Sequence, residues 1–265
     1  MKRIASFLVA VTALASSSVS QAVILEGAFT ATIFDSKDFT NLFGKGSGTN
    51  LQVGDSISGT IRIDTDLAPT AQTYGPEIAV YSGGTQDWLQ VGLTYNGVDL
   101  STYFQPTLQR VDVHYERQEG VPEEYAEVIQ EYKVGEYDFH NTRTSENSYS
   151  YYMAGIDALF HESGSATSVL DGIGLAQNFS WTNDGIFTQD HLGDGSFWLH
   201  DYDYWRDVNG NSYDHDYTAY ATLDYHVDFM TLHVVNAPEP TAIALFGFGL
   251  AGLGFVRRRN GKKAQ

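Results

Sequence analysis

Alternating apolar and polar side chains are the dominant pattern between residues 23 and 236. Residues 56–64 place Ile or Gly at every second position, with Ser, Thr, Arg or Asp between them. The longest such run covers residues 219–229, where Ala, Leu, Tyr, Val and Phe alternate with Tyr, Thr, Asp and His. Because successive side chains of a strand point to opposite faces, a period of two predicts half-buried β-strands.

Two hairpins and a further strand are expected from the same pattern. A strand is expected over residues 29–33, and Asn96-Gly97 between apolar residues favours a tight hairpin turn. A second hairpin is expected to join residues 111–115 to residues 126–134. Many short strands separated by Gly and Asn predict an all-β protein, built as an antiparallel β-sandwich or jelly roll.

Two segments also fit helices. Residues 123–133 could form a short helix in place of the second arm of the later hairpin. Near residues 151–161, the apolar side chains of Met153, Ile156 and Leu159 recur at helical spacing, so one helix is expected there.

The first 22 residues have the organisation of a removable signal peptide. Lys2 and Arg3 precede an apolar run that is shorter than the ~20 residues of a membrane span. Small residues at Ser20 and Ala22 suit a signal peptidase, so cleavage between Ala22 and Val23 is expected. The alternative is an uncleaved N-terminal anchor.

The last 29 residues, 237–265, have the reverse polarity. An uncharged, Gly-rich and Leu-rich stretch over residues 241–256 is followed by Arg257-Arg258-Arg259. As a helix it would be about 24 Å long, slightly shorter than a ~30 Å hydrocarbon core. Basic residues favour the cytoplasmic side, so a C-terminal transmembrane helix is expected to anchor the chain in the inner membrane with residues 23–236 outside.

Pro238-Glu239-Pro240, the Gly-rich span and Arg257, Arg258 and Arg259 together resemble the PEP-CTERM sorting domain, also called the ice-binding-protein C-terminal domain. Ala237 stands where that family most often has Val. The resemblance implies recognition by an exosortase, a membrane enzyme that cuts near Pro-Glu-Pro, in Gram-negative bacteria that make exopolysaccharide or biofilm matrix. It covers the tail alone and does not extend to the central domain.

Charge and composition restrict the partners of the central domain. Between residues 23 and 236, eight Lys and Arg residues stand against 32 carboxylates, a formal charge of −24. Such a surface repels nucleic acid and anionic lipid. The chain has no cysteine, which excludes disulfides, thiolate chemistry and Cys-based zinc sites. Neither GxSxG, HExxH nor a P-loop is present, so we expect no enzymatic activity.

One segment, residues 200–216, is dense in oxygen ligands. The candidate calcium ligands are Asp207, Asn209, Asn211, Asp214 and Asp216. Alternating Asp and Asn in a Gly-bent loop resemble the opening of an EF-hand-type loop, but Ser212 and Thr218 stand where that loop needs Gly and Glu. A solvated acidic turn is the alternative.

Aromatic residues surround this segment, and Trp198 and Trp205 are the candidate glycan-binding residues. Rings beside carboxylates suit sugar rings, although aromatic residues also fill sandwich cores. The sequence therefore favours an exported, exosortase-sorted structural protein of the envelope or extracellular matrix, associated with exopolysaccharide. A calcium-assisted glycan-binding module is the second hypothesis.

Overall fold

The computed structural model describes residues 23–83, 87–117, 128–145, 147–163, 168–183, 191–206, 209 and 212–236. Residues Ile24–Val235 form one compact unit.

The described residues form strands and one short 3-10 helix. The strands are β1 (Val23–Asp38), β2 (Gly48–Thr49), β3 (Ser56–Asp64), β4 (Gln72–Tyr74), β5 (Ile78–Gly83), β6 (Leu89–Tyr95), β7 (Val98–Asp99), β8 (Leu108–Arg117), β9 (Val128–Arg143), β10 (Ser148–Glu162), β11 (Phe179–Thr182), β12 (His191–Arg206) and β13 (Ser212–Asn236). The 3-10 helix η1 covers Leu100–Tyr103.

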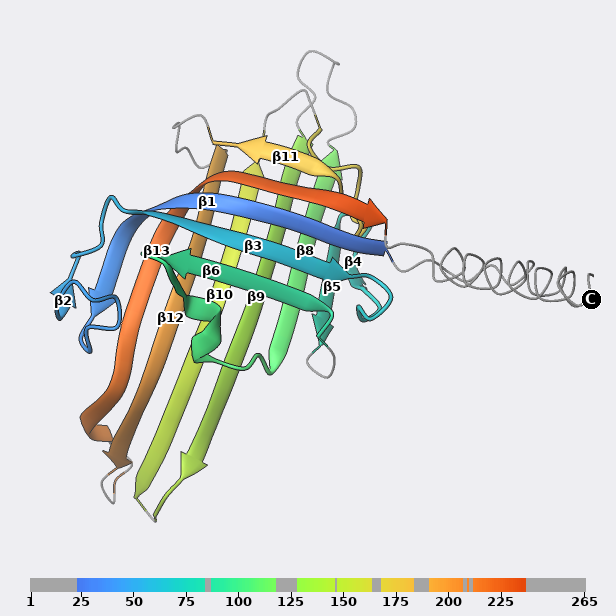
Figure 1. Cartoon of the computed structure of the whole chain (residues 1–265). Coiled ribbons are helices and arrows are strands. Elements are labelled where there is room, and N and C mark those ends of the chain that lie inside the picture. Colours follow the sequence, from blue (N-terminus) through green and yellow to red (C-terminus); the bar gives the residue numbers. More distant parts are fainter. Residues whose placement is uncertain are drawn as a thin grey trace, which may run out of the picture. The chain divides into compact units, whose positions relative to one another are not determined.

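The strands belong to one continuous antiparallel sheet that folds back on itself. Its order is β4-β5-β8-β9-β10-β12-β13-β1-β3-β6-β7, with β11 paired to β13 and β2 paired to β1. One layer contains β5, β8, β9, β10 and β12, and the other contains β1, β3, β6 and β11, whose strands cross the first layer steeply (Figure 1). The long strand β13 belongs to both, because it pairs with β12 up to His226 and with β11 from Phe229. The prediction of an all-β, antiparallel sandwich is confirmed.

The core lies between the two layers and follows the alternation of the sequence. Ile57, Ile61 and Ile63 of β3 are buried, whereas the Ser and Thr residues between them are exposed. The ring of Phe29 stacks on that of Tyr225 with centroids 6.1 Å apart. Phe29 also occupies the space that a side chain at position 59 would need, so Gly59 is required for this packing.

Both hairpins are confirmed. Asn96 and Gly97 have φ of 49° and 80°, the left-handed values of a two-residue hairpin turn, and they connect β6 to β7. Strands β8 and β9 pair from Leu108 to Arg117.

The helix expected near residues 151–161 is wrong, because this segment lies within strand β10. Ala154, Ile156, Ala158 and Phe160 face the core at every second position, and β10 pairs with β9 and β12 along nearly its whole length. The sheet covers both edges of the strand, and the apparent helical spacing arose because apolar residues occupy both of its faces. The alternative helix over residues 123–133 is also wrong from Val128, where β9 begins, and the residues before it lie outside the described ranges.

Four strands extend past the crossing layer (Figure 1). The extension consists of residues 138–143 of β9, 148–153 of β10, 200–206 of β12 and 212–219 of β13. In this part of the sheet β9 has no partner from β8, whose pairing ends at Tyr137. The extension therefore presents broad sheet surface outside the core.

Candidate functional site

The outer face of β9, β10, β12 and β13 carries an unusual concentration of aromatic rings. Register places Tyr149 opposite Tyr204 and Tyr151 opposite Tyr202, all on the same side of the sheet. We call this surface the aromatic face; its members are Tyr137, Phe139, Tyr149, Tyr151, Trp198, His200, Tyr202, Tyr204, Tyr217 and Tyr220. Alternation along each strand explains it, because these residues recur at every second position until a bulge in β13.

Neighbouring rings of the aromatic face contact one another. Ring centroids are 4.8 Å apart for Tyr151 and Tyr202, 5.6 Å for Tyr202 and Tyr217, and 5.0 Å for Tyr217 and Tyr220. Such separations are those of attractive aromatic pairs. Burial among these rings raises the pKa of Tyr202. Phe139 is nevertheless 57% exposed and Tyr217 is 44% exposed, so these two rings are accessible from outside, whereas Tyr204 is buried.

Trp198 lies across the backbone of β10. A Cβ atom added to Gly155 would stand 2.5 Å from Cζ2 and 2.8 Å from Cε2 of the indole, so the ring occupies the place of a side chain at this position. Tyr137 occupies the space above Gly135 in the same manner. The two rings are 5.7 Å apart between centroids, with an interplanar angle of 26°. Together they form a nearly continuous aromatic surface on the sheet.

A polar group borders this surface. Oδ1 of Asp157 accepts hydrogen bonds from N and Oγ of Ser196, at 2.9 and 3.0 Å. Oδ2 of the same carboxylate lies 3.3 Å from Nζ of Lys133 and accepts a weak bond from Tyr137 Oη at 3.5 Å. Burial, followed by the charge of Asp157, raises the pKa of Tyr137 far above its ordinary value, so this phenol stays a hydrogen-bond donor.

The structure separates the two tryptophans that the sequence placed in one site. Trp198 pairs with Gly155 on the aromatic face, whereas Trp205 pairs with Ser148. They are seven positions apart along one strand, and an odd separation puts side chains on opposite faces. Trp205 is 40% exposed and shares its face with Asp201 and Asp203.

The predicted calcium ligands are only partly described. Asn209 and Asp216 are exposed, whereas Asp207, Asn211 and the side chain of Asp214 lie outside the described residues. Within the described ranges, no group of three or more His, Asp or Glu residues is placed to hold a metal ion. The calcium site stays a prediction.

The predicted processing and sorting residues also lie mostly outside the description. Val23 begins β1, but Ala22, Pro238, Glu239, Pro240 and the arginines 257, 258 and 259 are not described. The apolar segment 241–256 is not described either. Among the residues that are described, no helix is long and apolar enough to cross a membrane.

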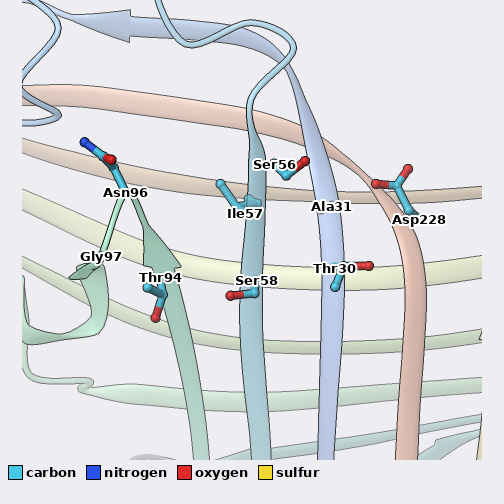
Figure 2. Close-up of a pocket in the computed structure, with 9 residues that line it drawn as sticks. All are labelled: Thr30, Ala31, Ser56, Ile57, Ser58, Thr94, Asn96, Gly97 and Asp228. Atoms are coloured by element: carbon cyan, nitrogen blue, oxygen red, sulfur yellow. The ribbon is translucent and has the colours of Figure 1, made fainter.

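A shallow depression of about 440 Å³ lies on the outside of the other layer. Figure 2 shows Thr30, Ser58 and Thr94 side by side on β1, β3 and β6, with Asn96 from the hairpin turn and Asp228 from β13 at its margins. Asp228 already accepts a 2.8 Å hydrogen bond from Thr32 Oγ1. The depression offers hydroxyl groups on a flat surface rather than a set of groups converging on a reacting atom.

Sequence reasoning identified Trp198 but missed most of the aromatic face. The signal was available, because tyrosines alternate at positions 149 and 151 and again at 202 and 204. The helical interpretation of residues 151–161 concealed it, since only a strand places the first pair on one side.

The described residues form an all-β domain, and a sorting motif follows it in the sequence. Residues 236–259 match the family described as the PEP-CTERM protein-sorting motif. This match is consistent with a PEP-CTERM protein, and the motif implies an exported, envelope-directed protein that an exosortase processes. No curated protein and no solved structure matches the chain.

Proposed function

We propose that the chain is a non-enzymatic structural protein of the cell envelope or extracellular matrix that associates with exopolysaccharide. The sorting motif at residues 236–259 carries this proposal, because it assigns the tail to an export system. Signal peptidase would release the N-terminus at Val23, and the apolar segment 241–256 would hold the chain in the inner membrane until an exosortase acts.

The architecture supports a structural and binding role. Asp157, a buried carboxylate that borders the aromatic face, is engaged by Lys133 and Ser196. The accessible features of the sandwich are broad surfaces on both layers. Broad sheet surfaces suit an extended polymer better than a small substrate, which needs a concave site that encloses it.

A calcium-assisted glycan-binding module remains the second candidate. The position of Trp198 on an accessible sheet face favours its glycan part. The calcium part rests on the composition of residues 207–216.

The proposal is tested by measuring the location and processing of the protein in its own host. The wild-type chain and a variant with Pro238-Glu239-Pro240 replaced by three alanines are followed by fractionation and by mass spectrometry of the C-terminal peptide. We expect the wild type in the exopolysaccharide fraction with a processed tail, and the variant retained in the membrane with its tail intact. Identical processing and location of both chains would contradict sorting by this motif.

A second strain separates association from sorting. In a host unable to make exopolysaccharide, the wild-type chain should be processed normally but released into the medium. If it stays on the cell surface of that strain, the association with exopolysaccharide is wrong.

A further inference from the structure

The rings of Trp198 and Tyr137 lie over the backbone of the sheet, at positions where Gly155 and Gly135 have no side chain. Glycines 155 and 135 produce this arrangement, because a side chain at either position would occupy the volume of the ring above it. Glycine is unfavourable inside a strand and marks a place where another group approaches the backbone closely. Glycine nevertheless occurs inside two neighbouring strands, at position 135 of β9 and position 155 of β10, and both glycines lie beneath the same aromatic surface.

An aromatic face carries negative electrostatic potential and attracts weakly positive C–H groups. Pyranose rings have such C–H groups on their flat sides and hydroxyl groups around their edges. Beside Trp198, Ser196 and Lys133 contribute a hydroxyl and an ammonium group, and both contact the buried carboxylate of Asp157. A few polar groups that border an aromatic surface can fix the orientation of a bound ligand.

The aromatic surface continues along the strands. Tyr202 lies four residues from Trp198 on β12, about 13 Å at strand rise, and its ring contacts that of Tyr151 on β10. On the aromatic face of the extension Phe139 is 57% exposed and Tyr217 is 44% exposed, so a long chain can lie along it without being enclosed.

The net charge of the domain indicates which class of ligand can bind to the aromatic face. The domain between residues 23 and 236 carries a formal charge of −24. A polyanionic polysaccharide and a second copy of this chain would both be repelled by such a surface, whereas a neutral polymer is not.

We propose that the aromatic face binds a neutral polysaccharide, with sugar rings stacked on Trp198 and Tyr137 and the polymer continuing over Tyr151 and Tyr202. This inference rests on the proposed association with exopolysaccharide and names the surface and the ligand class for it.

Affinity electrophoresis of the exported protein tests the inference, with hydroxyethyl cellulose as a neutral probe and alginate as an anionic one. We expect retardation by hydroxyethyl cellulose and none by alginate. Trp198→Ala should weaken binding at least about tenfold, the loss expected for a central aromatic contact. Trp205→Ala is the matched control, because it removes a more exposed indole from the opposite face of the same strand and should leave binding unchanged.

Two further variants distinguish loss of the aromatic ring above Gly155 from loss of the fold. Trp198→Phe keeps a ring above Gly155 and should retain much of the binding. Gly155→Ala leaves the indole in the chain but displaces it from the sheet, and it should weaken binding while circular dichroism shows the β-signal retained.

The outcomes distinguish this inference from the proposed function. If the wild type and Trp198→Ala bind the host's own exopolysaccharide equally, the aromatic face is not the binding surface, although the proposed function stands. If the wild type binds neither that polymer nor either probe, the proposed function fails with the inference. Equal retardation by alginate, or a dimer that Trp198→Ala dissociates, would overturn the neutral polysaccharide as the occupant.

Discussion

A buried carboxyl group joins the two layers, and its ionisation should limit stability. Glu136 of β9 is 5% exposed. Its Oε2 accepts a 2.7 Å hydrogen bond from Val91 N of β6, and its Oε1 accepts a 3.0 Å bond from Gln109 Nε2. Gln109 Nε2 also donates to Leu89 O at 2.6 Å. Glu136 and Gln109 therefore hydrogen-bond to backbone groups of β6, and these bonds connect the crossing layer to β9.

Burial raises the pKa of Glu136 from 4.5 to about 7, although its two hydrogen bonds oppose the shift. The folded state therefore binds more protons than the unfolded state between these values. The favourable contribution of protonated Glu136 is complete below pH 4.5, is lost as pH rises to 7 and is absent above it. At 1.36 kcal/mol for each pKa unit, the loss amounts to about 3 kcal/mol.

Glu136→Gln should remove this dependence. The amide has nearly the same size and stays neutral, and its oxygen can accept from Val91 N. Its nitrogen takes the place of Oε1 and faces Gln109 Nε2, so the amide of Gln109 must turn to accept through Oε1, which is buried without a hydrogen-bond partner among the described residues. We expect the variant to match the wild type near pH 5 and to exceed it by up to about 3 kcal/mol at pH 8, where the wild-type carboxyl is ionised.

Urea unfolding of the exported protein at pH 5, 6, 7 and 8 measures the difference in unfolding free energy. Glu26→Gln, at an exposed position of β1, controls for the loss of one negative charge. A difference between Glu136→Gln and wild type that does not change with pH would refute the reasoning. A variant less stable than wild type at pH 8 would show that the hydrogen bonds outweigh the cost of burying the charge.

Three other predictions concern packing, processing and metal binding. Gly59→Ala should lower the unfolding free energy by about 1–3 kcal/mol, because the new methyl group overlaps the ring of Phe29; denaturant unfolding measures it, and unchanged stability would contradict that packing. Mass spectrometry of the exported protein should find Val23 at its N-terminus, and a chain still carrying Met1 would contradict cleavage. Millimolar calcium should raise the melting temperature above a matched magnesium control, and Asp207→Ala should abolish that shift; a shift that survives the substitution would place the site elsewhere.

The sequence predicted the fold wherever one face of a strand is solvated. Residues 56–64 and 219–229 alternate cleanly because one side of each faces the core and the other is more exposed. Strand β10 was not recognised from the sequence, because both of its faces carry apolar groups and its period-two signal is therefore weak. The bend of β13 was also not predictable, because nothing in the local pattern specifies where a long strand passes from one layer to the other.

The candidate site depends on the parity of positions along a strand, which sequence analysis can use only after the strand is known. Trp198 and Trp205 are close in sequence and equally aromatic. Trp198 nevertheless lies on the same side of the sheet as the tyrosines of β10, whereas Trp205 lies on the same side as Asp203. Once β12 is assigned as a strand, alternation places the tyrosines at 202 and 204 on the same face as Trp198 and places Trp205 on the opposite face. The glycines at 135 and 155 then acquire a role that composition does not reveal, since each supports a ring contributed by an aromatic residue of the sheet. The aromatic face is thus encoded in short periodic patterns on four strands, and pairing those strands is the step that combines them into one surface.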